Sequence, residues 1–600
     1  MSGDVMQLVT QFKTACANYD INAIDSHTAL CETLDALAGD LGKDGETRIQ
    51  FGVGEVWTEI HKLWRDLVHA QLTFWDGDDS DDGDDAGSIK ERKKQHSLSS
   101  LCVSLARFMR NLVAGVSGNQ IKAFEDEPII RRLLHYYTSW SSIEDEEASF
   151  TARILTQMLS NIITGNEALI SNLWETYLNL QEDQVILIRL LASPDNRILL
   201  AVLTMIINCV RESRSRTGNF EHGDVTGLLD RWRASHQNFH RKMLTRTPIG
   251  ARICIILLDD MVKLYDADEG SEGARAFDVG YSIFTRIIET GLMPDLYIKL
   301  AIMDEIVTPH QTTLLKLLDS YLQSTPVSSP GTQSRIMKTH VKLCPMLSNL
   351  FFSLSTYAQT AMRRSLLSSD SNVVPDHSID VDVQGPPAEL DVLLPKVCEA
   401  LVLTAQCIIT ITLAAHSYHH SSPTSSNSTA STHESIHAFF NQIHLEGVGL
   451  VENLVELLRL LDRFLPRINF GKPVATSAGP TVEQTKQKET LAPSVQAPTP
   501  APGNPGFNFL KRDLVRLLGI LCNEDRAVQD RLRKCGGIEV VLNLCVIDER
   551  NPYLREHAIF ALHNLLKDNP ANQAVVEEIK PTGQWDENGV LKDTPRAVRK

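Results

Sequence analysis

The sequence predicts an all-α protein, an armadillo- or HEAT-like superhelix of helical repeats with disordered loop insertions. Hydrophobic residues make up 43% of the 600 residues and aromatic residues only 6%, so leucine, isoleucine, valine and alanine supply most of the core. Such a core suits helix-on-helix packing better than a sandwich or barrel. Internal similarity at a fixed period is typical of solenoids. Strand-length alternation and hairpin turn pairs, which would indicate sheets, are absent from the sequence.

The repeat is clearest near the C-terminus, where the segment from Arg512 recurs 44 residues later at Glu556. We expect one unit to contain a short helix at 528–534, a second at 538–545 and a long third at 552–566. Asn551 should cap the third helix, with Pro552 at its first position. The aligned pairs are Leu518 and Leu562, Leu521 and Leu565, Gln529 and Gln573, and Leu532 and Val576.

An asparagine near the end of each third helix is a candidate protein-interaction residue. Asn564 has upstream counterparts at Asn111, Asn161 and Asn208, which are spaced by 50 and 47 residues. In an armadillo groove such an asparagine can bind the backbone of an extended peptide. It can equally bond adjacent repeats to each other, because buried polar groups need partners.

Import receptors of the importin type place tryptophan one turn before this asparagine. The positions here hold Arg107, Gln157, Thr204 and Phe560. The missing tryptophans count against an importin-like adaptor that binds basic peptides, which remains the alternative function.

Composition divides the chain into helical regions and flexible segments. The latter are rich in Asp, Ser, Pro or Gly, which cannot offset the entropy of ordering. The expected order is N-terminal helices at 1–75, an acidic flexible loop at 76–98, armadillo-like repeats at 99–365, a flexible loop at 366–388, helical repeats at 389–470 with a Ser/His-rich loop at 416–433, a Pro-rich linker at 471–506 that separates two arrays, a C-terminal repeat domain at 507–581 and a tail at 582–600.

Charge and targeting signals favour a cytosolic protein whose partners are proteins. The net charge is −17, and no long basic run offers a surface for nucleic acid. The most apolar stretch, 397–415, is interrupted by polar residues and is expected to be a buried helix rather than a membrane span. The 11 cysteines form no CxxC pair and fit a reducing compartment.

No motif predicts catalysis, a cofactor or a metal. The acidic loop resembles the start of an EF-hand from Asp78, but Ile89 stands where a bidentate glutamate is required. Phosphate loops, nucleophile elbows and HExxH are missing. The histidines of the Ser/His-rich region are not spaced as metal ligands would be, and we expect them to lie in a solvated loop. They are His416, His419, His420, His433, His437 and His444.

Three serines are candidate phosphorylation sites, and all are expected in or near loops. Ser97 follows Lys93-Lys94, Ser365 follows Arg363-Arg364, and Ser329 precedes a proline. Motifs as short as these arise often by chance.

From 507 to 581 the chain resembles the C-terminal domain of the ataxin-10 family, in a form typical of fungal members. Asp548, Asn551-Pro552 and Glu556 are more specific than the general armadillo pattern. Two residues depart from the family's pattern: His557 stands where an aromatic such as tryptophan is expected, and His563 where arginine is usual. The segments that carry the likeness are 509–522, 535–538, 542–548, 551–556 and 569–573.

The resemblance implies a cytoplasmic, non-enzymatic scaffold that self-associates, binds protein partners and contributes to cytokinesis and cell division. For the C-terminal domain, Arg555 and Glu556 are the first candidates for an interaction surface. Their alternative role is pairing on the helix surface, which contributes little to stability.

Overall fold

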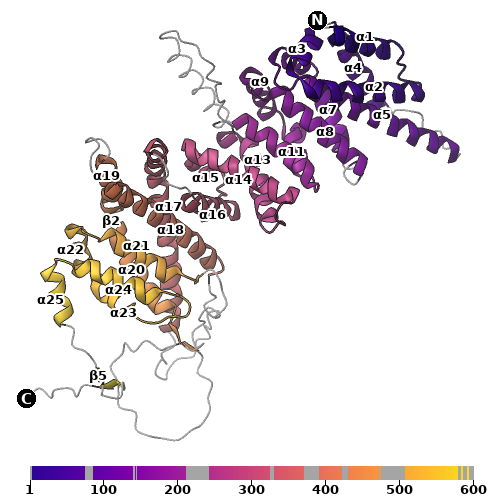
Figure 1. Cartoon of the computed structure of the whole chain (residues 1–600). Coiled ribbons are helices and arrows are strands. Elements are labelled where there is room, and N and C mark those ends of the chain that lie inside the picture. The colour runs from indigo at the N-terminus through magenta and orange to yellow at the C-terminus, as the bar shows by residue number, and fades with distance from the viewer. Residues whose placement is uncertain are drawn as a thin grey trace, which may run out of the picture. The chain divides into compact units, whose positions relative to one another are not determined.

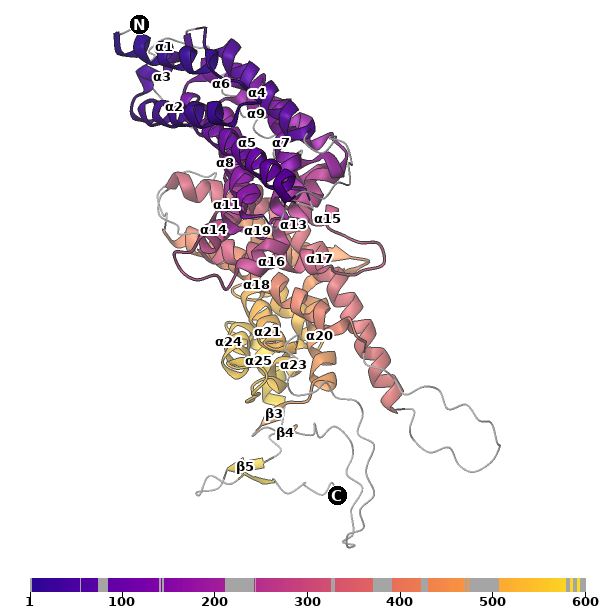
Figure 2. The same ribbon diagram turned by 90° about the vertical axis from the view of Figure 1, so that its right-hand side faces the viewer.

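The computed structural model describes residues 3–53, 55–73, 85–139, 142, 145–210, 242, 244–324, 330–370, 391–421, 430–469, 472–473, 507–578, 583–585 and 591–593. The chain divides into two compact units, Met1–Leu300 and Ala301–Lys600. Both are stacks of α-helices, so the predicted all-α repeat fold is confirmed (Figures 1 and 2).

The helices of the first unit form two long stacks and one shorter pairing. One stack contains α2, α5, α8, α11 and α14, each packed on the next; a second contains α4, α7, α10 and α13; and α3 packs on α6 (Figure 1). This is the three-helix repeat of the armadillo pattern. The helices are α1 (Gly3–Ala17), α2 (Ile24–Lys43), α3 (Gly45–Val53), α4 (Trp57–Leu72), α5 (Asp85–Leu112), α6 (Ser117–Phe124), α7 (Glu127–Tyr137), α8 (Glu146–Ile163), α9 (Glu167–Leu178), the 3-10 helix η2 (Glu182–Gln184), α10 (Ile186–Leu191), α11 (Asn196–Val210), α13 (Pro248–Leu264), α14 (Glu272–Thr290) and α15 (Met293–Lys299).

The second unit repeats this arrangement. Its third helices stack in the order α16, α18, α21 and α24, its second helices in the order α17, α20 and α23, and α22 packs on α25 (Figure 2). The helices are α16 (Pro309–Ser324), α17 (Pro330–Asp370), α18 (Leu394–Ser421), α19 (Ala430–Gln442), α20 (Leu450–Phe464), α21 (Leu510–Leu521), α22 (Arg526–Lys534), α23 (Gly537–Asn543), α24 (Leu554–Leu566) and α25 (Pro570–Glu578).

Three short antiparallel strand pairs occur in the second unit, none of them anticipated from the sequence. They are β1 (His444–Leu445) with β2 (Val448–Gly449), β3 (Ile468–Asn469) with β4 (Lys472–Pro473), and β5 (Gly583–Trp585) with β6 (Leu591–Asp593). The first pair closes a tight turn with positive φ at Glu446 (51°) and Gly447 (83°). This turn lies between α19 and α20.

Helix α18 contains the apolar stretch noted in the sequence. Within the described residues, Leu394–His416 is the one segment that is long and apolar enough to cross a membrane, with 23 residues and a mean hydropathy of 1.9. It packs against α16, α17, α19 and α21. Val397, Leu401 and Ile408 have no exposed surface. These contacts favour the interpretation as a core helix.

Several predicted loops are shorter than expected because helices extend into them. Helix α5 begins at Asp85, inside the acidic loop set at 76–98, and α17 continues to Asp370. Helices α18 and α19 occupy both ends of the loop set at 416–433. Polar residues do not stop a helix when its apolar positions keep helical spacing.

The prediction that 471–506 separates two arrays is wrong. Helix α21 packs on α18 and α20, and α22 and α23 also pack on α20. The C-terminal repeats therefore continue the stack of the second unit. The sequence could not reveal this, because contacts across a long insertion leave no local periodicity.

The third helix of the C-terminal repeat also begins later than predicted. It starts at Leu554, with Tyr553 at the N-cap position. The side chain of Asn551 caps no helix there. Instead it accepts a hydrogen bond from the backbone N–H of Lys511 at 3.1 Å.

Candidate protein-interaction surfaces

The asparagines for which both peptide binding and bonding between repeats were considered hold successive third helices of the first unit together. Asn111 Nδ2 of α5 donates to the Ala38 carbonyl of α2 at 2.8 Å, and Asn161 Nδ2 of α8 donates to the Arg110 carbonyl of α5 at 3.2 Å. Asn208 of α11 donates to two hydroxyl groups at the end of α8, that of Ser160 at 3.2 Å and that of the C-cap residue Thr164 at 3.0 Å. We call this series the amide ladder.

The same contact recurs in the C-terminal repeats. Asn564 Nδ2 of α24 donates to the Gly519 carbonyl of α21 at 2.9 Å, and the Asn564 side chain is buried. A β-carbon at Gly519 would lie 3.0 Å from Ala561, so the absence of a side chain there lets α21 and α24 approach closely. All four asparagines make bonds between repeats, which supports the structural interpretation over the peptide-binding one.

Amides of the first helices add a second set of bonds between repeats. Gln120 Nε2 donates to the carbonyls of Asn161 (3.0 Å) and Thr164 (2.9 Å), and Gln529 Nε2 donates to the carbonyl of Asn564 (2.9 Å). In both repeats the third-helix asparagine therefore donates through its side chain and accepts through its backbone. The sequence indicated that this glutamine recurs, since Gln529 aligns with Gln573. It could not show that a glutamine of the first helix bonds to an asparagine of the third helix, because that contact depends on the fold.

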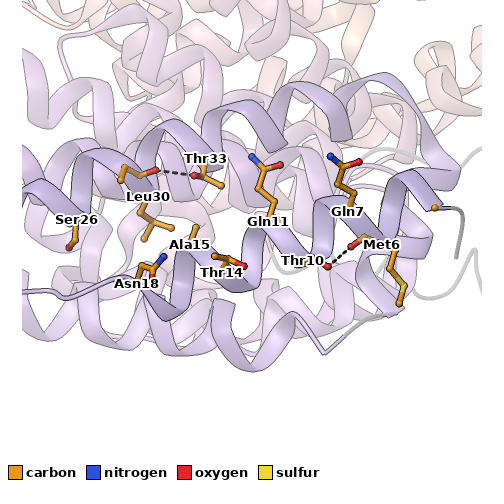
Figure 3. A pocket seen from close by; sticks show the side chains of 12 residues that line it. Met6, Gln7, Thr10, Gln11, Thr14, Ala15, Asn18, Ser26, Leu30 and Thr33 are labelled. Carbon is orange, nitrogen blue, oxygen red and sulfur yellow. Dashed lines mark hydrogen bonds between the residues drawn. The ribbon is translucent and has the colours of Figure 1, made fainter.

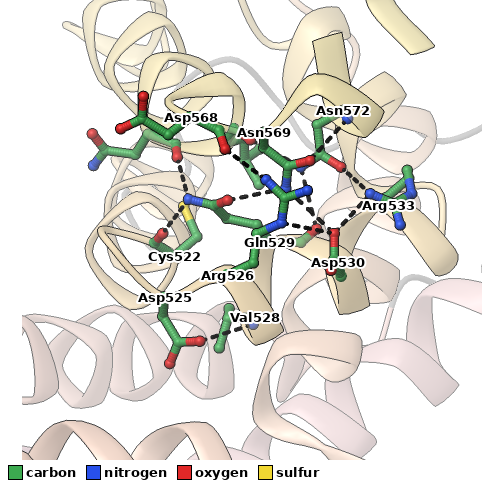
Figure 4. A network of polar contacts seen from close by, with 12 residues as sticks. Cys522, Asp525, Arg526, Val528, Gln529, Asp530, Arg533, Asp568, Asn569 and Asn572 are labelled. Carbon is green, nitrogen blue, oxygen red and sulfur yellow. Dashed lines mark hydrogen bonds and ion pairs between the residues drawn. The ribbon is translucent and has the colours of Figure 1, made fainter. Parts of the chain in front are cut away.

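A further polar network surrounds Gln529 where α22 meets α25 (Figure 4). Asn569 Nδ2 donates to Gln529 Oε1 at 3.0 Å, and Asn572 Nδ2 donates to the Leu565 carbonyl at 2.9 Å. Arg533 bridges Asp530 and Asn572, each at 2.7 Å. The two asparagines have no exposed surface. Their bonds therefore replace water and fix the last helix on the stack.

Two of the residues most specific to the family resemblance, Asp548 and Asn551, build a junction with the segment that follows α20. Asp548 is buried and accepts hydrogen bonds from the backbone N–H of Ile468 (3.2 Å) and from Asn551 Nδ2 (2.8 Å). The Glu549 N–H donates to the Ile468 carbonyl at 3.0 Å. The role of Asp548 and Asn551 is thus to shape a buried turn.

A buried lysine reinforces this junction. Lys511 has no exposed surface, and its Nζ donates to the Leu465 carbonyl at 2.8 Å and to Asp462 Oδ1 at 3.2 Å. Burial lowers the pKa of Lys511, and Asp462 opposes that effect. On the neighbouring helix Arg531 pairs with Glu452 of α20 through two nitrogens, at 2.8 and 2.6 Å.

Arg555 and Glu556 lie on the outer surface of α24. Arg555 Nη2 and Glu556 Oε1 are 3.5 Å apart, and the two side chains are 49% and 56% exposed. Both side chains are accessible to a partner protein. Their contact with each other is the helix-surface pairing that the sequence suggested as their alternative role.

Two of the three candidate phosphorylation sites lie inside helices, not in loops. Ser97 is in α5 and Ser365 in α17. Ser97 Oγ bonds to Nδ1 of buried His27 at 2.8 Å, and His27 Nε2 bonds to the Ile21 carbonyl at 3.0 Å. Phosphorylation of Ser97 would have to break this contact. Ser329 lies outside the described residues.

A recess of about 1240 Å³ crosses α5, α8 and the start of α11 in the first unit. Two guanidinium groups lie close to the ring of Phe150, that of Arg107 5.4 Å and that of Arg153 4.8 Å from its centroid. Acidic residues cluster at the helix starts along the recess, among them Asp145, Glu147 and Glu272. The mixture of charges selects no one class of ligand.

A second recess, of about 740 Å³, lies between α1 and α2 (Figure 3). None of its lining side chains is charged. Thr10 and Thr33 donate their hydroxyls to their own helices, to the carbonyls of Met6 (2.8 Å) and Ala29 (3.0 Å). The recess is therefore a shallow seam between two helices.

The thiols of this chain are not poised for chemistry. Burial raises the pKa of Cys254 and Cys522 to about 12, so they stay protonated at neutral pH. Within the described residues, no three His, Cys, Asp or Glu side chains gather as metal ligands would. Of the histidines expected in a solvated loop, His416 lies in α18 and His437 in α19, and their rings meet edge to face with centroids 5.7 Å apart.

Comparison with known proteins identifies relatives of the C-terminal repeats. A family model described as the spinocerebellar ataxia type 10 protein domain matches residues 510–598. The ataxin-10 homolog of Dictyostelium discoideum is 45% identical over 83 residues, 14% of each chain. That of Kluyveromyces lactis is 30% identical over 139 residues, 22% of this chain and 26% of the relative. Human ataxin-10 is 35% identical over 79 residues, 13% and 17% of the two chains.

These matches confirm the family resemblance read from the sequence, and they span about a quarter or less of each relative's length. Among solved structures, a circular tandem repeat protein with novel repeat topology and enhanced subunit contact surfaces aligns over 96% of this chain and 99% of its own. The identity is 13% and the TM-score 0.23. At that score the alignment carries no argument, and the fold assignment rests on the helix packing described above.

Proposed function

We propose that this chain, a member of the ataxin-10 family by its C-terminal domain, is a non-enzymatic scaffold that binds other proteins. The observation that supports this most is how its polar side chains are used. The side-chain amides of the repeats bond one helix to the next, so they build a rigid framework and leave exposed faces such as that of α24 for partners. Rigid helical stacks with long exposed faces suit protein binding.

The cellular role we propose follows from the family. Such a scaffold acts in the cytoplasm, associates with further copies of itself, and contributes to cytokinesis and cell division. This chain's relatives match it over the C-terminal repeats, so these repeats are the part on which a shared role would depend.

Removal of the whole gene product tests the proposal. Deleting 507–600 alone would uncover α18 and α20, on which the C-terminal repeats pack, and would confuse misfolding with lost function. We expect cells without the protein to accumulate unseparated daughters, and a proximity-labelling fusion to the full chain to recover proteins of the division site. Normal septation in the deletion strain would refute the division role.

Self-association has a separate test. Sedimentation velocity of the purified full chain over a wide concentration range should show species larger than a 66.8 kDa monomer. A single monomeric species at all concentrations would contradict it.

The importin-like alternative gains no specific support. Its peptide-binding asparagines are occupied by bonds between repeats, and Arg107, Gln157, Thr204 and Phe560 stand where tryptophans would be needed. Salt-sensitive binding of a lysine-rich peptide together with nuclear shuttling would revive it.

A further inference from the structure

Two aromatic residues begin the last two third helices in a strained backbone conformation. Phe509 is at the N-cap of α21 with φ 65°, and Tyr553 is at the N-cap of α24 with φ 66°. They are 44 residues apart, which is the repeat period. Left-handed φ costs a residue with a β-carbon roughly 1 kcal/mol or more, and the usual occupant is glycine or asparagine.

In the part of the chain that the structure describes, aromatic residues with positive φ occur in the C-terminal repeats alone. Within the described residues, the other non-glycine positions with positive φ are acidic: Asp304, Glu446, Glu524 and Asp568. Glu524 and Asp568 also differ by 44 residues, but they follow helix ends, where a left-handed residue is common. An aromatic side chain at the start of both helices needs another explanation, because strained positions cluster at functional sites.

Core packing does not explain the two rings. Phe509 is 39% exposed and Tyr553 70% exposed, so their removal would leave no internal cavity. Phe560, two turns further along α24, is 49% exposed. Its repeat-equivalent on α21 is Arg516. The axes of neighbouring packed helices lie about 8–10 Å apart. Roughly three residues of an extended chain span that distance.

Arginines lie among these rings. The Arg512 guanidinium stacks on the Phe509 ring, 4.4 Å from its centroid, and also pairs with buried Asp513 at 2.7 Å. Arg516 is half-buried and makes no ion pair within the described part of the chain. Burial lowers the pKa of His557 between them, and Arg516 and Arg512 add more to this effect than Asp513 and Glu556 remove. Arg516 is thus a cationic group with no acidic partner in the described part of a chain whose net charge is −17.

We propose that Phe509, Arg516, Tyr553 and Phe560 form a binding surface for a short extended segment of a partner protein that carries aliphatic and acidic side chains. The aliphatic groups pack on the rings, and a carboxylate pairs with Arg516. The left-handed N-caps hold the rings outward at a spacing fixed by α21 and α24. This inference deepens the proposed scaffold function by naming a surface and the chemistry of its partner.

The surface can be tested on the full-length chain with labelled peptides of about ten extended residues, followed by fluorescence polarisation. One peptide alternates leucine with glutamate, a second replaces glutamate by lysine, and a third replaces it by phosphoserine. We expect the glutamate peptide to bind, more weakly as salt is raised, and the lysine peptide to bind at least tenfold more weakly.

Substitutions separate binding from folding. Arg516→Glu should weaken the glutamate peptide at least tenfold. Tyr553→Gly should weaken it several-fold while the midpoint of urea unfolding stays the same or rises, because glycine adopts positive φ without strain. Asp568→Gly is the matched control, since it relieves the same backbone strain away from the rings and should leave peptide affinity unchanged.

Other results would overturn the proposal. Unchanged affinity in Tyr553→Gly and Arg516→Glu would place the binding elsewhere, and binding by the phosphoserine or lysine peptide alone would assign another class of partner. Binding seen only after removal of residues 579–600 would make the chain's own C-terminal segment the occupant. Normal division in Tyr553→Gly cells that have lost peptide binding would leave the scaffold function standing and remove only this surface.

Discussion

One junction of third helices in the second unit, that of α18 with α21, is joined by different chemistry from the junctions of the first unit. In the first unit an asparagine amide joins α5 to α2, α8 to α5 and α11 to α8. In the second unit the step from α18 to α21 has no asparagine, since Ile520 stands where Asn564 stands one repeat later. There Gln406 of α18 donates to buried Asp513 of α21 at 2.9 Å. Lys511 of α21 adds bonds to the second helix α20, to Asp462 and to the Leu465 carbonyl that follows it.

The difference shows how a repeat stack can continue across a long insertion. An amide bond between identical repeats needs only the repeat's own sequence. Residues 474–506 separate α20 from α21 in the sequence, so the packing of α21 joins segments that are not consecutive repeats. Buried charged groups with several partners make that packing specific. The cost is desolvation, so loss of one partner should be far more damaging than loss of one amide.

The largest effect is expected at Lys511. Lys511→Ala leaves the Leu465 carbonyl and Asp462 without their donor, and removing one partner of a buried ion pair typically costs about 3–5 kcal/mol. Urea unfolding followed by hydrogen exchange in α20 and α21 would measure this. Lys567→Ala is the control, because its pair with Glu524 is exposed (45% and 68%) and should contribute less than about 1 kcal/mol. Equal losses in the two variants would contradict the comparison.

The second unit should also respond to acid through His340 of α17. Burial lowers the pKa of His340 to about 4, below the ordinary value of 6.5. The unfolded chain therefore binds a proton at a higher pH than the folded chain. The free energy of unfolding should fall as pH drops from 6.5 to 4, by up to roughly 3 kcal/mol.

His340→Leu should remove this part of the pH dependence, and it also removes a buried Nδ1 that has no hydrogen-bond partner. Urea unfolding of both proteins at pH 7 and pH 5 is the measurement, with exposed His563→Gln as the control. If His340→Leu keeps the full slope, the acid sensitivity lies in other groups.

Loss of single amides should cost less. Asn564→Ala leaves the Gly519 carbonyl buried without its donor, and we expect a loss of about 1–3 kcal/mol. Asn208→Ala should cost less than Asn564→Ala, because the hydroxyls of Ser160 and Thr164 can turn to other acceptors. Thermal unfolding of the single variants would rank them, and a larger loss for Asn208 would contradict the amide ladder as described.

The smallest change is expected at Arg555 and Glu556. Their contact is exposed and 3.5 Å long, so the double substitution Arg555→Ala/Glu556→Ala should shift the free energy of unfolding by less than about 1 kcal/mol. Circular dichroism during urea unfolding can check this. A large loss would mean that α24 is covered in solution, which would support association of copies through that helix.

Local sequence patterns predicted the helices, the repeat and the recurring asparagines of the third helices. Helical periodicity and a 44-residue repeat can both be recognised from the sequence alone. They did not decide what the asparagines do, since Asn161 offers the same amide to a peptide or to Arg110 of the preceding helix. Only the packing of α8 on α5 settles that choice. Nor could they predict Tyr553 at the N-cap, because Asn551-Pro552 is an ordinary helix start in isolation and Lys511, 40 residues earlier, competes for the Asn551 oxygen.

Helix α18 has a consequence for how the protein is made. Its apolar segment passes the length and hydropathy test for a membrane span, yet in the folded chain it lies under α21, which begins roughly 90 residues further on. Ribosomes add about 5–20 residues per second, so α18 emerges several seconds before its cover exists. During that interval the nascent chain presents a segment that targeting factors and chaperones could bind. The order of synthesis therefore makes the centre of the second unit its most vulnerable part.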